Sequence, residues 1–161
     1  MAPKSSQSVA SIPWLYTLFF LYIEPVATAA GAYAAHFTQS LYMRLTYTSP
    51  TAAFQAVTTT ESIVLTQLAN LYLVFAINEA LVLRCTNDRR VWRTFLLGLL
   101  IADFGHLYSV HPLGWQFYYR FWEWNAIHWG NLGFVYIGAA TRTAFLLGVG
   151  LDLERPGRRK R

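Results

Sequence analysis

Long apolar stretches alternate with short polar stretches along the whole chain. Four of the apolar stretches, over residues 13–37, 61–84, 91–110 and 125–151, are long enough to cross a bilayer, because a spanning helix needs about 20 mostly apolar residues. A single chain that spans lipid without forming a barrel must do so as helices, since helices satisfy their own backbone hydrogen bonds. The pattern therefore predicts an all-α protein, a four-transmembrane-helix bundle with short loops.

The segments between the predicted spans differ in character. Residues 38–60 are predicted to carry a short interfacial helix, and Glu24-Pro25 inside the first span predicts a kink. Residues 111–124 are rich in Trp, Tyr and Phe, which is typical of an aromatic belt at a membrane–water interface. The membrane domain is expected over 12–151.

Outside that domain, residues 1–11 are predicted to form a flexible N-terminus and residues 152–161 a basic cytosolic tail.

Composition favours lipid as the surroundings of this chain. Only 13% of the residues are charged and 17% are aromatic, whereas a soluble domain carries about a quarter charged residues. The net charge of +5 is concentrated in two clusters that border apolar segments, which favours anionic lipid headgroups over nucleic acid. The single Cys85 excludes an intramolecular disulfide framework and a Cys-based zinc site. The clusters are Arg84, Arg89, Arg90 and Arg93, and Arg155, Arg158, Arg159, Lys160 and Arg161.

The distribution of basic residues also predicts an orientation. Lys4 and both basic clusters fall at one end of the predicted bundle, and only Arg44 and Arg120 lie in the loops at the other end. The positive-inside rule then places both termini in the cytosol, as four spans require. We therefore expect an integral, multi-pass protein of the endoplasmic reticulum membrane.

Two carboxylic acids fall near the middle of different spans. Counting about 1.5 Å per helical residue puts Glu24 and Asp103 roughly 16–18 Å from the cytosolic face. With no Lys or Arg expected at that depth, the two groups cannot both be ionised cheaply, so one is expected to stay protonated. Ionisable groups inside a membrane are functional candidates by default, and a protonated acid in an apolar chamber can serve as a proton donor.

Other polar residues are predicted to join the two acids. His106 lies one turn beyond Asp103 and would orient or reprotonate it, and Glu79, expected nearer the cytosolic end, is a reserve catalytic candidate. Aromatic faces would stabilise a cation, and amides and imidazoles would bind or deprotonate the substrate. The candidate substrate-binding residues are Asn70, Asn78, Glu123, Asn125, His128, Asn131, Tyr22, Tyr108 and Trp129.

Each of these residues also has a structural interpretation. Glu79 could pair with Arg142 across the bundle, and the asparagines could serve as interhelical hydrogen-bond partners. Asp103 and His106 could form a structural pair, and Glu123 and Asn125 could cap the fourth span. The sequence contains neither a His-rich box nor a Glu-x-x-His pattern, so a metal site is not expected.

Several blocks of the chain resemble a known group of proteins. The stretches FLYIEP (20–25), QLANLYLVFAINEALVLR (67–84), LLIADFGHLYS (99–109) and WNAIHWGNLGFVYIGAATR (124–142) are similar to a family of small fungal four-helix integral membrane proteins. Some proteins of this kind, the ascofuranone-type terpene cyclases among them, act in meroterpenoid biosynthesis. The resemblance implies protonation of a terminal epoxide on a prenyl chain, followed by cyclisation of the cation. The better-known fungal cyclases have seven spans, so no catalytic residue is transferred from them.

A second resemblance concerns architecture alone. Sterol Δ8–Δ7 isomerases also line a lipophilic pocket with acids, Trp and Asn inside a small helical bundle, and they also protonate an alkene. Three functions therefore remain in view: a membrane-bound terpene cyclase of secondary metabolism, a sterol-isomerase-like lipid isomerase, and a non-catalytic lipid-binding or scaffold protein. The enzymes would act on a prenylated phenol or a sterol-like molecule without a cofactor, because protonation and deprotonation balance. The expected partners are this substrate and membrane lipid, with oligomerisation left open and no nucleic acid.

Overall fold

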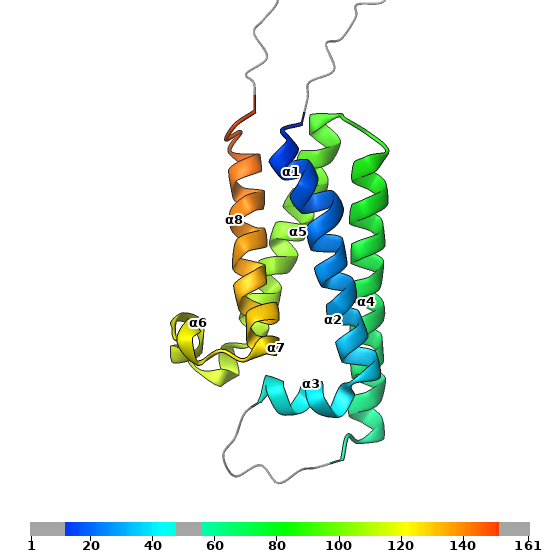
Figure 1. Cartoon of the computed structure of the whole chain (residues 1–161), viewed down its shortest axis with the longest axis vertical. Coiled ribbons are helices and arrows are strands. Elements are labelled where there is room, and N and C mark those ends of the chain that lie inside the picture. The colour runs from blue at the N-terminus through cyan, green and yellow to red at the C-terminus, as the bar shows by residue number, and fades with distance from the viewer. Residues whose placement is uncertain (1–11, 48–55, 152–161) are drawn as a thin grey trace, which may run out of the picture.

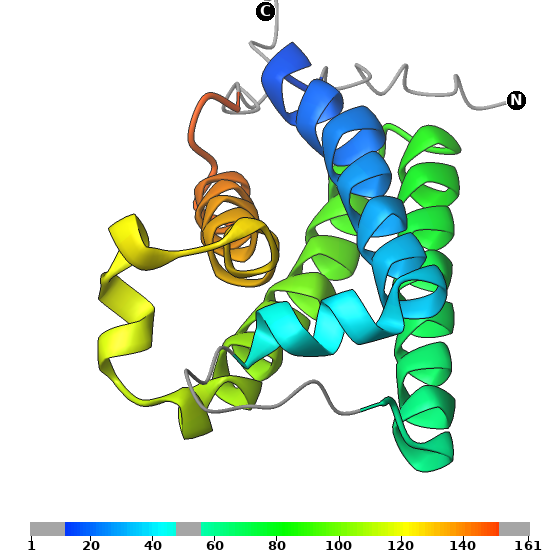
Figure 2. The same cartoon turned by 60° about the horizontal axis from the view of Figure 1, so that its bottom comes forward.

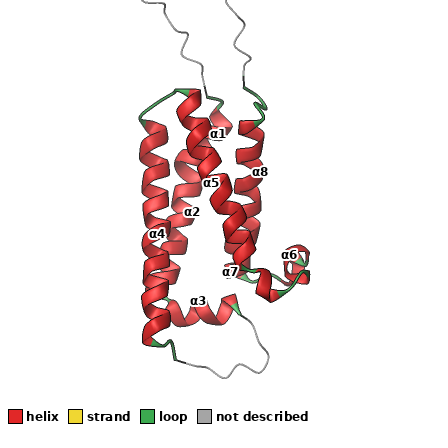
Figure 3. Ribbon diagram, turned by 180° about the vertical axis from the view of Figure 1, so that it is seen from behind, coloured by secondary structure: helices red, strands yellow, loops and turns green. Residues whose placement is uncertain are grey.

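The structure is a computed structural model that describes residues 12–47 and 56–151 (Figure 1). All regular secondary structure within these ranges is helical (Figure 3), which confirms the all-α prediction. The predictions made for residues 1–11 and 152–161 lie outside the described residues.

The first helix is continuous from α1 (Trp14–Leu18) through a π-helical segment (Phe19–Ile23) into α2 (Glu24–Phe37). Proline has no N–H to donate to the carbonyl four residues earlier, which for Pro25 is that of Leu21. Arg84 Nη2 donates to the Leu21 carbonyl instead, at 2.8 Å. The irregularity predicted at Glu24-Pro25 therefore takes the form of π-helical turns just before it.

The remaining long helices begin at side-chain caps. At the start of α4, Thr58 Oγ1 accepts from the Glu61 N–H while the Glu61 carboxylate accepts from the Thr58 N–H, a capping box that satisfies two otherwise free donors. Asp88 caps α5 through the Arg90 N–H at 2.7 Å. The elements after α2 are α3 (Gln39–Thr46), α4 (Thr59–Arg84), α5 (Arg89–Ser109), a 3-10 turn (His111–Leu113), α6 (Gln116–Tyr119), a second 3-10 turn (Phe121–Glu123), α7 (Ala126–His128), a second π-helical segment (Trp129–Phe134) and α8 (Val135–Leu146).

Three helices in the described residues are long and apolar enough to cross a membrane. They are Trp14–Phe37, Thr59–Arg84 and Arg89–Leu113. The fourth predicted span corresponds to α7, the second π-helical segment and α8, which follow one another without a break from Ala126 to Leu146.

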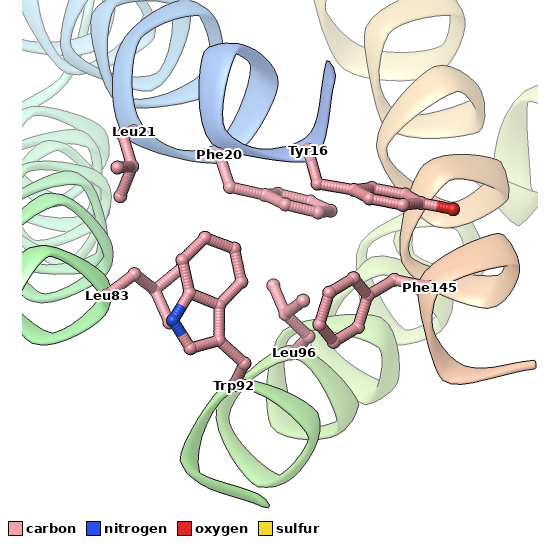
Figure 4. Close-up of a cluster of buried hydrophobic side chains, with 7 residues drawn as sticks. All are labelled: Tyr16, Phe20, Leu21, Leu83, Trp92, Leu96 and Phe145. Carbon is pink, nitrogen blue, oxygen red and sulfur yellow. The ribbon is translucent and has the colours of Figure 1, made fainter. Parts of the chain in front are cut away.

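The helices associate as two pairs, α2 with α4 and α5 with α8. The pairs meet where α1 begins and α8 ends, around a cluster of buried, mostly aromatic side chains that Figure 4 shows. We call this region the closed end. The Phe145 ring packs edge-on against Tyr16, with centroids 5.1 Å apart, and the Trp92 indole N–H donates to the Thr86 carbonyl at 2.9 Å. The cluster consists of Tyr16, Phe20, Leu21, Leu83, Trp92, Leu96 and Phe145.

At the opposite end, which we call the cavity end, α3 crosses beneath the helices (Figures 1 and 2). Two side chains near α7 hold the last turn of α3: Asn125 Nδ2 donates to the Leu45 carbonyl at 2.8 Å, and His128 Nε2 lies 3.3 Å from the Thr46 carbonyl. The helix predicted within residues 38–60 is thus confirmed as α3. It closes the bundle from below.

Candidate functional site

A cavity of 640 Å³ lies between the two helix pairs. The α2 side of its wall is built from small residues, namely Ala27, Ala30, Gly31 and Ala34, and the other helices contribute aromatic rings. The wall also includes Phe75, Trp129 and Ile137, which are 42%, 50% and 54% exposed. The cavity therefore reaches the outer, apolar surface of the bundle. The aromatic lining residues are Tyr42, Tyr72, Phe75, Trp129 and Phe134.

Four charged residues meet at one end of this cavity, and each comes from a different helix. Arg142 on α8 binds Asp103 on α5, with Nη1 2.6 Å from Oδ2, and its Nη2 donates to Glu24 Oε1 on α2. Glu79 Oε1 on α4 lies 3.9 Å from Arg142 Nη2, and its carboxyl is a near neighbour of that of Glu24. We call these four residues the acid cluster. It joins both helix pairs.

A glycine makes room for the guanidinium. Gly138 lies one turn before Arg142, and a Cβ at this position would stand 2.7 Å from Arg142 Nη1 and 3.5 Å from Glu24 Oε1. A side chain at residue 138 would therefore displace the guanidinium from its present position beside Glu24. Gly138 is thus a positioning residue of the cluster.

The acid cluster has three carboxyl groups for one guanidinium. Arg142 is the only Lys or Arg among the described residues that line the cavity. Glu24 Oε2, Glu79 Oε1 and Arg142 Nε are buried without a hydrogen-bond partner in the protein. Full ionisation would leave two negative charges uncompensated in an apolar site, which is costly. The arrangement therefore favours retention of at least one proton within the cluster.

His106 stands one helical turn from Asp103, further into the cavity. Its ring centre is 6.3 Å from that of the Tyr72 ring, and its Nε2 is buried without a hydrogen-bond partner in the protein. From Glu24 to Ala34, both of which line the cavity, ten residues of helix rise about 15 Å. The cavity is thus elongated, with the acid cluster at one end and α3 at the other.

One π-helical segment lines this cavity and the other ends next to it. The first ends at Ile23, immediately before Glu24, and the second contributes Asn131, Gly133 and Phe134 to the wall. Single π-helical turns inside α-helices frequently occur at functional sites, because they redirect side chains that a regular helix would place elsewhere.

The four predicted catalytic residues, Glu24, Glu79, Asp103 and His106, all line one cavity. The expectation that Glu24 and Asp103 lack a basic neighbour is wrong, because Arg142 binds both. The prediction that His106 orients Asp103 is also wrong: Arg142 is the partner of Asp103, and His106 Nε2 has none.

The expected depth of Glu79 is also wrong. Counted from the end of α4, Glu79 should lie beside the cytosolic arginines. Arg84 at that end instead reaches the Leu21 carbonyl and lies 4.9 Å from the centre of the Tyr22 ring. The end of α4 therefore meets the first helix about two turns in from its start, which brings Glu79 to the depth of Glu24. The interpretation that Glu79 approaches Arg142 is confirmed, although the two atoms are 3.9 Å apart.

The predicted substrate-binding residues divide into three groups. Asn131 and Trp129 line the cavity. Asn125 and His128 hold α3, and Asn125 also caps α7 by accepting from the His128 N–H at 3.0 Å, which confirms its capping interpretation. The other five are exposed and outside the cavity lining: Asn70, Asn78, Glu123, Tyr22 and Tyr108. The prediction that Asn70, Tyr22 and Tyr108 face a central chamber is therefore wrong.

Helix geometry explains these misplacements. Successive residues are about 100° apart around a helix, so the face of α4 that carries Tyr72 and Glu79 turns Asn70 and Asn78 away from the cavity. On α5, Tyr108 is two residues past His106 and is 77% exposed. Glu123 pairs with Arg120 at 2.6 Å on the surface.

Sequence reasoning did not identify Gly138 or Tyr42 as part of the site. Tyr42 on α3 and Tyr72 on α4 both line the cavity. The i, i+4 spacing of Gly138 and Arg142 was the available signal, because a small residue one turn from a buried arginine leaves room for its guanidinium.

Comparison with known proteins identifies a family for this chain. The chain belongs to the family described as Domain of unknown function (DUF7704), whose model matches residues 9–152. No curated protein and no solved structure matches the chain. Family membership covers the whole helical bundle but carries no activity with it.

Proposed function

We propose that this protein is an integral membrane enzyme that isomerises a lipophilic substrate by proton-initiated carbocation chemistry. The observation that carries the proposal is the placement of a carboxyl-rich cluster at the end of an apolar cavity open to the lipid-facing surface. A retained proton there faces substrate rather than water. Aromatic rings along the wall offer faces that attract positive charge.

The elongated cavity favours cyclisation of an epoxidised prenyl chain. Such a chain is long, narrow and apolar, and carries its reactive epoxide at one end. In the proposed step, a carboxyl of the Glu24–Glu79 pair protonates the epoxide oxygen, the C–O bond opens to a tertiary cation, and the electrons of the neighbouring alkene close the ring. The final cation loses a proton to the carboxylate or to His106 Nε2. The product is an isomer of the substrate, so no co-reactant is consumed.

The structure changes the assignment of roles within the proposal. Asp103 binds Arg142 at 2.6 Å, so we assign it to positioning of the guanidinium. Glu79 is farther from Arg142, and its Oε1 has no hydrogen-bond partner. We therefore place Glu79 first as the proton donor, with Glu24 sharing the proton.

We further propose that Ala126–Leu146 forms a fourth span, with both termini cytosolic in the endoplasmic reticulum. Large apolar side chains cover the outside of the helices, among them Val26, Ile101 and Phe104, each at least 60% exposed. Trp115 and Trp122 are exposed near α6 at the cavity end, where an aromatic belt would lie at the lumenal interface.

The test uses the full chain in microsomes supplied with an epoxidised farnesyl-phenol in deuterated water. We expect an isomeric cyclic product, and turnover should fall at least about 100-fold in Glu79→Gln, in line with the loss of a general acid. Glu123→Gln removes an exposed carboxyl by the same change and should leave turnover intact.

The same membranes are supplied with an 8-ene sterol to test the isomerase alternative. A rearranged sterol with deuterium in the product would assign the chemistry to that substrate class. No turnover of either substrate, together with a loss of stability alone in Glu79→Gln, would support the scaffold function. The links that Arg142 makes among the helices favour that function as the second candidate.

A further inference from the structure

We infer that the cavity binds lipophilic amines in their protonated form, with the ammonium group at the acid cluster. This inference concerns the ligand class of the same cavity and rests on the proposed function only in sharing its site. Three carboxyl groups face one guanidinium, and no other Lys or Arg lines the cavity within the described part of the chain.

The acid cluster has free acceptors for a cationic group. Glu24 Oε2 and Glu79 Oε1 are buried without a hydrogen-bond partner in the protein. Both belong to residues that line the cavity. An ammonium N–H donates to carboxylate oxygens in short, charge-assisted hydrogen bonds. One bound monocation would also reduce the excess negative charge of the cluster.

The rest of the cavity suits the apolar part of such a ligand. The rings of Tyr72, Phe75 and Phe134 and the small residues of α2 line the wall of the cavity. Aromatic faces attract cations most strongly where water is excluded, so rings close to the cluster would also contribute to ammonium binding. A length of about 15 Å along α2 accommodates an extended alkyl chain that points toward α3. Because Phe75 and Trp129 are also exposed on the outer surface, an amphiphile could enter from the bilayer.

The probe is tritiated N,N-dimethyldodecylamine, and the matched neutral ligand is the branched alkane in which CH replaces the nitrogen. Equilibrium binding is measured with the full chain in nanodiscs of neutral phosphatidylcholine, with empty nanodiscs subtracted. We expect saturable binding of the amine that the alkane does not displace. Binding should weaken about tenfold in Glu79→Gln, equivalent to about 1.4 kcal/mol, and stay unchanged in Glu123→Gln.

A steric variant tests the site without altering charge. Ala30 lines the cavity from α2, so Ala30→Leu should abolish amine binding. Ala140 is exposed on α8 and outside the cavity lining, so Ala140→Leu should retain it. If Glu79→Gln does not assemble, the inference is tested by comparing Ala30→Leu with Ala140→Leu and by comparing amine with alkane binding to the wild-type protein.

Equal binding of amine and alkane, or equal amine binding to Ala30→Leu and Ala140→Leu, would overturn the inference. Its failure is distinguishable from failure of the proposed function. Amine binding without turnover of any alkene or epoxide would support the inferred ligand class and contradict the proposed enzymatic function. Turnover of a substrate without preferential binding of the amine would support the enzyme and overturn the inferred ligand class.

Discussion

The two ends of the bundle are built from the same helices but from side chains of different size. At the closed end, Tyr16, Phe20, Trp92 and Phe145 fill the space between the helix pairs. At the cavity end, α2 contributes alanines and a glycine, and 640 Å³ stays open. Packing at the closed end joins the two helix pairs, so the cavity end can leave space between the pairs, although α2 and α4 stay packed on each other there. The cavity is thus a consequence of residue size along α2.

The acid cluster lies at the boundary between these two ends. Its charges tie the helix pairs together on one side and face the cavity on the other. Arg142 binds acids from both helix pairs, so its replacement is the first test of this comparison.

Replacement of Arg142 should have the largest effect on stability. Arg142→Met leaves buried carboxyls without their partner, so we expect the free energy of unfolding to fall by about 3–5 kcal/mol. Denaturant titration in mixed micelles measures it. Arg93 is exposed, so Arg93→Met should change stability by less than about 0.5 kcal/mol. A similar small effect in both variants would contradict a central role for Arg142.

Adjacent leucines on α5 compare the closed end with the lipid-facing surface directly. Leu96 is fully buried and Leu97 is 49% exposed. Leu96→Ala should lower the free energy of unfolding by about 2–5 kcal/mol, because it leaves a void among packed rings. Leu97→Ala should cost much less. Equal costs, measured by the same titration, would show that the closed end is not the main source of stability.

The link between α4 and the first helix should contribute less. Arg84→Met leaves the Leu21 carbonyl without its donor, at an expected cost of about 1–3 kcal/mol. Pro25→Ala restores an N–H that can donate to this carbonyl, so the double variant should recover part of the loss. If the two substitutions change the free energy of unfolding additively, the Arg84–Leu21 hydrogen bond does not compensate for Pro25.

The smallest expected effect concerns the closure of the cavity by α3. Asn125→Ala removes the cap of α7 and the bond to the Leu45 carbonyl, which should cost about 1 kcal/mol. Hydrogen exchange over residues 39–46 should accelerate while exchange in α5 stays unchanged. Asn78→Ala is the control, since Asn78 is exposed. Unchanged exchange in α3 would show that Asn125 does not hold it.

Sequence patterns predicted the elements better than the contacts between them. Long apolar runs and the Thr58–Glu61 and Asp88 caps depend on local sequence, so the helices were predicted to within a few residues, apart from the end of the last one. The similar depth of Glu24 and Asp103 followed from counting residues along their helices, but their shared partner Arg142 did not. The position of Glu79 did not, because the relative height of two helices depends on tertiary contacts such as that of Arg84 with Leu21.

Counting residues along a helix gives the depth of a side chain but does not show whether that side chain faces the cavity. Asn70 lies near the required depth but points away from the cavity, because Tyr72 and Glu79 define the inward face of α4. The role of Arg142 was left as one alternative. The sequence alone could not show that Arg142 binds the acids, because this depends on the space that Gly138 leaves for the guanidinium beside Glu24.

The central claim is that the acid cluster keeps a proton at neutral pH. Infrared spectroscopy of the full chain in nanodiscs measures this directly, through the C=O stretch of a protonated carboxyl and its shift in deuterated water. We predict such a band in the wild-type protein and its loss in Glu79→Gln, with no change in Glu123→Gln. A wild-type spectrum with carboxylate bands alone would contradict the account.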